Sequence, residues 1–125
     1  MKILKDLFLM ILVILTPIKA ALITVGVLVI MDLFLGLAAA KKRKEPITSS
    51  GLRRTVSKLL VYEMAIILGF ITETYLAGSI VPISKIISGL IGITELKSIL
   101  ESLDEVNGAS IFDSLIKKLG SKNDV

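Results

Sequence analysis

AALITVGVLVIMDLFLGLAAA, at residues 20–40, is followed directly by KKRK at residues 41–44. The first stretch contains one charged residue, Asp32. A helix of about 20 apolar residues is long enough to cross the roughly 30 Å hydrocarbon core of a membrane. A soluble fold of this size buries too small a fraction of its surface to hide many such stretches. We therefore expect residues 20–40 to form a membrane-spanning helix.

The composition of the whole chain agrees with a lipid environment. The 125 residues are 54% hydrophobic, with a mean hydropathy of +0.85 and a net charge of +4. The absence of Cys and His excludes disulfides, Cys/His zinc sites and His-based catalytic triads. Aromatic residues are few and Trp is absent, which argues against a nucleic-acid partner. We expect a single helical membrane domain over residues 1–125 that is not an enzyme and needs no cofactor.

The first apolar run, Leu7–Leu15, has two interpretations. Nine residues reach only about 14 Å as a helix, but the run from Ile3 to Ile18 can cross the membrane if its flanking lysines extend to the surface. The alternative is a signal peptide that is cleaved after Ala20. The residues before Ala20 fit a cleavage site poorly, so we favour a retained helix.

Two further apolar runs follow residue 58. The run Leu59–Leu76 can span the membrane, with Glu63 and Glu73 facing other helices or the membrane edges. These two acids are about 15 Å apart along a helix, too far to act as a catalytic pair. A turn is expected at 77–82. The next helix begins at Ile83, and its second half is amphipathic, so we expect that half to leave the membrane and lie on the surface.

Residues 107–125 are predicted to form an amphipathic helix with a polar tail, after a break at Asn107-Gly108. The sequence thus predicts an all-α integral membrane protein. It would have three or four transmembrane helices and this C-terminal amphipathic helix.

Residues 41–58 are predicted to form a basic connector, with a turn marked by Pro46 and residues 49–51. Basic loops are retained in the cytoplasm, so this connector sets the topology. The C-terminus would then be cytoplasmic and the 77–82 turn external. The residues that determine this topology are Lys41, Lys42, Arg43, Lys44, Arg53, Arg54 and Lys58.

Asp32 is the most informative single residue, because a carboxylate inside a span is costly unless it faces protein or water. Gly36 and Ala40 lie on the same helical face, and small residues at this spacing allow close helix contact. One interpretation is a helix-contact or pore-facing surface formed by Asp32, Gly36 and Ala40. The other is that Asp32 pairs with a lysine of the connector.

A second series of small residues, Ser84, Ser88 and Gly92, has the same spacing, as do Ala65 and Gly69. These series form either an interface between copies or ordinary contacts within one chain.

Two groups of residues resemble a known family, the small phage-lysis and toxin-secretion holins of family 4. The central group comprises Asp32, Gly36, Ala39 with the lysines after it, Ser49-Ser50-Gly51 and Lys58. The later group comprises Glu95, Ser98-Ile99-Leu100-Glu101 and Gly108. The resemblance extends over residues 22–119. It departs from the family at Ser102, where Asn often follows the Glu.

The resemblance implies a phage holin. Such a protein is a multi-pass protein of the bacterial host's cytoplasmic membrane, contacts lipid, forms homo-oligomers and opens lesions during host lysis. A cell-wall hydrolase, or endolysin, then reaches its substrate without having to touch the holin. The alternatives are a non-lytic structural membrane component of a phage particle or larger complex, and a small channel subunit.

Overall fold

The computed structural model describes residues 1–108 and 111–121, and in this part of the chain every regular element is a helix. The predicted all-α class is therefore confirmed. A short 3₁₀ turn, Thr16–Ile18, joins the first two helices. The helices are α1 (Lys2–Leu15), α2 (Lys19–Lys42), α3 (Ser49–Tyr75), α4 (Ile83–Asn107) and α5 (Ile111–Ser121).

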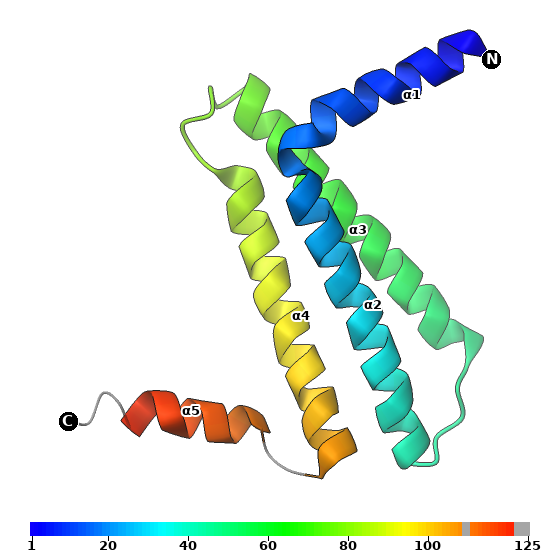
Figure 1. Cartoon of the computed structure of the whole chain (residues 1–125), viewed down its shortest axis with the longest axis vertical. Helices are drawn as coiled ribbons and strands as arrows, with labels where there is room; N and C mark the ends of the chain where they lie inside the picture. Colours follow the sequence, from blue (N-terminus) through cyan, green and yellow to red (C-terminus); the bar gives the residue numbers. More distant parts are fainter. Residues whose placement is uncertain (109–110, 122–125) are drawn as a thin grey trace.

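Three of these helices, α2, α3 and α4, pack side by side as a bundle in which α3 runs opposite to the other two (Figure 1). We call the end that carries residues 41–48 the basic end, and the end that carries the 76–82 turn the far end. The helix α1 leaves the bundle at the far end, and α5 follows α4 at the basic end. This arrangement follows from the short loops, since short connections between long helices produce antiparallel neighbours.

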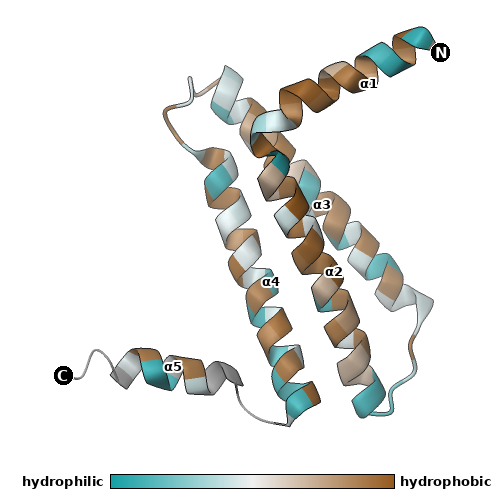
Figure 2. Cartoon of the chain, in the orientation of Figure 1, coloured by the Kyte–Doolittle hydropathy of each residue, from teal (hydrophilic) through white to brown (hydrophobic). Residues whose placement is uncertain are grey.

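The apolar core lies in the half of the bundle nearest the far end. Val29 of α2 and Ile66 of α3 are fully buried, and Ile91 of α4 packs against them. Gly69 allows α3 to approach α4 closely, because a Cβ there would lie 2.7 Å from Ile87 Cδ1. The outside of the bundle, by contrast, exposes many large apolar side chains, and Figure 2 shows hydrophobic residues along most of α1 and α2.

The helix α1 has no buried residue, and it points away from the bundle (Figure 1). Its direction changes at the 3₁₀ turn because Pro17 cannot donate a helical hydrogen bond. Two helical stretches, Lys2–Lys42 and Ser49–Tyr75, are long and apolar enough to cross a membrane. The predicted count of three or four spans is therefore not confirmed by helix length and hydropathy.

The connector between the second and third helices is shorter than predicted. The helix α3 already begins at Ser49, so the turn expected at residues 49–51 is wrong. Thr48 has an extended backbone at the N-cap position, and a series of small polar residues after it is typical of a helix start. As a consequence, Arg53, Arg54 and Lys58 lie on α3 instead of in a loop.

The prediction for the second half of α4 is also wrong in part. Glu95 and Ile99 are buried in the bundle, so this half packs against the other helices and does not lie on a surface. The break at Gly108 is confirmed, because this residue has a left-handed backbone with φ of 70° and ends α4. The last residues of the predicted polar tail, 122–125, lie outside the described residues.

Candidate functional site

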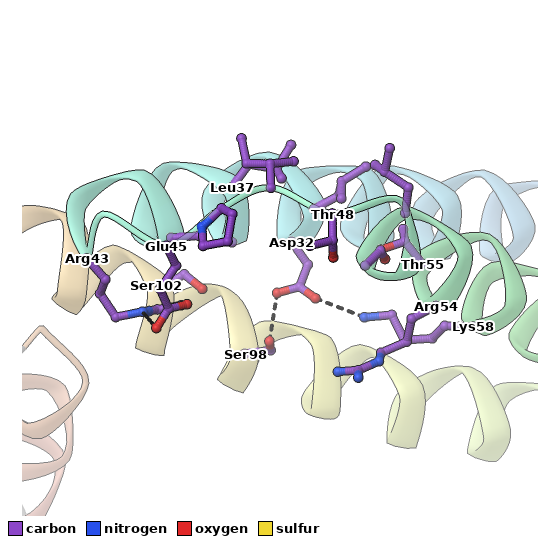
Figure 3. Close-up of a pocket in the computed structure, with 17 residues that line it drawn as sticks. Asp32, Leu37, Arg43, Glu45, Thr48, Arg54, Thr55, Lys58, Ser98 and Ser102 are labelled. Carbon is purple, nitrogen blue, oxygen red and sulfur yellow. Dashed lines mark hydrogen bonds and ion pairs between the residues drawn. The ribbon is translucent and has the colours of Figure 1, made fainter.

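A cluster of charged side chains connects all three helices of the bundle, in the half nearest the basic end. Lys58 Nζ of α3 lies 2.9 Å from Asp32 Oδ2 of α2 (Figure 3). The same Nζ lies 3.2 Å from Glu95 Oε2 of α4. Ser98 Oγ of α4 donates a hydrogen bond of 2.7 Å to the other carboxylate oxygen of Asp32. We call these four residues the polar cluster.

The polar cluster is largely shielded from solvent. The Glu95 side chain is 2% exposed and the Asp32 side chain 13%, while Lys58 retains 29% exposure. Such groups are tolerated away from water only when they are paired and hydrogen-bonded. One ammonium group therefore lies within ion-pair distance of two carboxyl groups.

The structure pairs Asp32 with a lysine of residues 41–58, as one of the two interpretations of this residue required. The other interpretation, a face that meets another copy or a pore, concerns an assembly and stays a prediction. Glu95 and Ser98 of the polar cluster were not singled out as pairing partners from the sequence. The spacing of Ile91, Glu95 and Ile99, four residues apart, places all three on one helical face and is the signal for burial of Glu95.

An open cavity of about 510 Å³ lies beside the polar cluster, between α2, the 43–48 loop and α3. Gly36 and Ala40 form part of its α2 wall, together with Asp32. A Cβ at Gly36 would meet no atom within 4 Å, so this face of α2 is not occupied by the rest of the described chain. We call this cavity the groove. The predicted face of Asp32, Gly36 and Ala40 thus lines an open space.

The basic end is closed by contacts between α2, its following loop and the end of α4. Lys42 Nζ donates a 2.9 Å hydrogen bond to the Val106 carbonyl, and Arg43 forms ion pairs with Glu45 and Glu105. These pairs are solvent-exposed. Hydrogen bonding to Glu45 and then to Glu105 raises the pKa of the Arg43 guanidinium, and Arg43 lowers the pKa of the Glu45 carboxyl. The other predicted topology residues on this end, Lys41, Lys44, Arg53 and Arg54, are exposed.

Two residues of the second small-residue series, Ser84 and Ser88, form hydrogen bonds within the chain. Ser84 is buried, and both its backbone N–H and its hydroxyl donate 3.1 Å hydrogen bonds to Glu73 Oε1 of α3. The hydroxyl of Ser88 donates to the Ser84 carbonyl, and Gly92 is half-buried with open space around its Cβ position. Gly69 contacts this part of α4, so the contacts seen at Ser84 and Gly69 are within one chain.

Glu73 has a role that the sequence did not reveal. The backbone N–H groups in the first turn of a helix have no partner within the helix, and Pro82 at the N-cap of α4 supplies no side-chain acceptor. Glu73 supplies one from the neighbouring helix, where its negative charge also interacts favourably with the helix dipole. The described residues contain no group of three or more acidic, His or Cys side chains arranged to hold a metal ion.

Comparison with known proteins identifies one family for this chain. The family model described as the bacteriophage holin family matches residues 4–123. Neither a curated protein nor a solved structure matches the chain. The family match includes all the helices of the bundle and every residue of the polar cluster, and it agrees with the two long apolar stretches in indicating a membrane protein. The chain belongs to the bacteriophage holin family.

Proposed function

We propose that this protein is a working holin, which associates with further copies of itself in the host's cytoplasmic membrane and opens lesions there. A cell-wall hydrolase then passes through and reaches its substrate. The observation that carries this proposal is the family match over nearly the whole chain. Members of this family are in general not enzymes, so the function rests on assembly.

The bundle has the physical properties that such assembly requires. Its outside is apolar and suited to lipid, whereas the polar cluster and the groove provide a polar interior. Lipid supplies no hydrophobic force between helices, so small-residue faces and polar groups must drive association. The α2 face of Asp32, Gly36 and Ala40 offers both beside the groove.

The positions of the charged residues support the proposed topology. The basic end would lie in the cytoplasm, because Lys41, Lys42, Arg43 and Lys44 are gathered there. The 76–82 turn would then be external, and α1, which joins α2 at the far end, would either lie flat on the outer surface or cross the membrane. The C-terminal helix α5 would be cytoplasmic, since it follows α4 at the basic end.

Induced expression in a bacterium tests the lytic function. Cells that make the protein together with a matching cell-wall hydrolase should lyse abruptly, and cells that make it alone should stop growing and lose their membrane potential. Hydrolase alone is the control. Continued growth with a normal membrane potential would exclude a lytic function and favour a structural component. A steady, ion-selective conductance without sudden loss of potential would favour a channel subunit.

A Gly36→Leu variant tests the α2 contact face. A Cβ at this position would meet no atom of the described residues within 4 Å, so the variant should fold normally while its added bulk prevents a second copy from approaching. We expect fewer cross-linked oligomers and later lysis. Gly26→Leu is the matched control, since Gly26 lies on the same helix and also has free space. Equal oligomer yields from the two variants would exclude this face from the assembly.

A further inference from the structure

The two halves of α3 are attached to the bundle very differently. The buried residues of α3 are Ile66, Gly69 and Phe70, all in its second half. None of residues 49–60 is buried, and the groove lies between this first half and α2. Figure 1 shows the same asymmetry, since α3 diverges from α2 toward the basic end.

Lys58 is the residue that connects the exposed first half of α3 to both neighbouring helices. Its ammonium contacts Asp32 on α2 and Glu95 on α4 at the same time. Arg54, one turn earlier, lines the groove but has no ion pair among the described residues (Figure 3). Leu59 is the first residue of α3 that packs against the apolar core, so the ion pairs of Lys58 are the contacts that link the segment before it to both α2 and α4.

We infer that the ion pairs of Lys58 with Asp32 and Glu95 hold the first half of α3 against α2 and α4, and so control when the bundle opens. We call these ion pairs the latch. Release of the latch lets residues 49–58 move away from α2 and widens the groove. Asp32, Glu95 and Ser98 then face a continuous polar space. This inference rests on the proposed holin function, for which it supplies the regulation.

The strength of the latch depends on the amount of water around it. Attraction between charges is strong in a low-dielectric interior and falls many-fold in water. Lys58 is already the most exposed charge of the polar cluster, on the side of the groove. Once several copies share a hydrated space, water weakens the ion pairs in each of them. Assembly and opening therefore reinforce each other.

Distance measurements in lipid bilayers test the latch directly. The chain has no cysteine, so Ser57→Cys on α3 and Lys97→Cys on α4, both exposed, give two unique positions for spin labels. With Lys58 present we expect one short distance. Lys58→Met should add a longer population and bring lysis forward. Lys85→Met, which removes an exposed lysine at the far end, is the control and should change neither result.

A milder variant covers the case in which Lys58→Met does not accumulate. Ser98→Ala removes one hydrogen bond to Asp32 and keeps all three charges, so the ratio of open to closed forms should rise roughly 3- to 10-fold. Lys58→Asp alone should lose the short distance. The double variant, with Asp32→Lys and Lys58→Asp, exchanges the two charges and restores an ion pair, so it should recover that distance.

The outcomes separate the latch from the proposed function. If Lys58→Met and Ser98→Ala give the same distances as Lys85→Met, the latch is wrong, whether or not the cells lyse. If the original chain never lyses cells but the distances change as expected, the latch stands and the holin function is wrong. Altered distances with an unchanged time of lysis would show that the latch does not control the timing.

Discussion

At the far end of the bundle, α3 meets α4 through Gly69 and a compact apolar core, whereas toward the basic end it is held through Lys58 beside an open groove. The first kind of contact depends on shape, because a lipid-solvated bundle gains from close packing. The second depends on charge, and its strength changes with hydration. A single helix therefore has a fixed half and a half that can be released.

The largest expected effect comes from breaking the shape-dependent half. A Cβ at Gly69 would lie 2.7 Å from Ile87 Cδ1, 3.3 Å from Ile83 Cγ2 and 3.7 Å from the Ser84 backbone. Ile87 can rotate away from an alanine, but a leucine must displace α4 itself. Gly69→Leu should lower the free energy of unfolding by about 3 kcal/mol, measured by denaturant titration in a membrane mimetic. Gly89→Leu has free space and serves as the control. Equal losses from the two variants would contradict the close packing at Gly69.

A smaller effect is expected at the start of α4, where Glu73 of α3 accepts hydrogen bonds from Ser84. Glu73→Ala removes the acceptor of the Ser84 N–H and hydroxyl and leaves both without a partner. We expect a loss of about 1–2 kcal/mol in the same titration, together with faster amide exchange in the first turn of α4. Glu101→Ala, which removes an exposed glutamate from α4, is the control and should leave the free energy of unfolding nearly unchanged. Unchanged amide exchange at Ser84 would show that Glu73 does not cap this helix.

The smallest effect concerns pH at the exposed basic end. Arg43 lowers the pKa of Glu45, so the charged carboxylate favours the folded state at neutral pH. This contribution is fully present above the ordinary glutamate pKa of about 4.3 and disappears as the pH falls through the lower folded value. An NMR titration of the Glu45 carboxyl should therefore have its midpoint below the ordinary value, and Arg43→Gln should return it upward. A midpoint that Arg43→Gln leaves unchanged would show that the pair does not persist in solution.

Much of the local structure could be predicted from the sequence. Apolar runs bounded by polar and turn-forming residues located the helices, and the glycine at residue 108 located the end of α4 correctly. The start of α3 was misplaced because Ser49, Ser50 and Gly51 are common both in turns and at helix starts. The composition of a short segment does not distinguish these two cases.

The sequence by itself determined the helical class, the apolar outer surface, the concentration of basic residues at residues 41–58 and the membership of the holin family. These properties depend on residue type and spacing along one chain. The tertiary structure alone decided that Lys58 meets Asp32 and Glu95, and that Glu73 caps α4. Such pairings join residues on different helices, and they depend on how each helix is rotated about its axis when the three pack together.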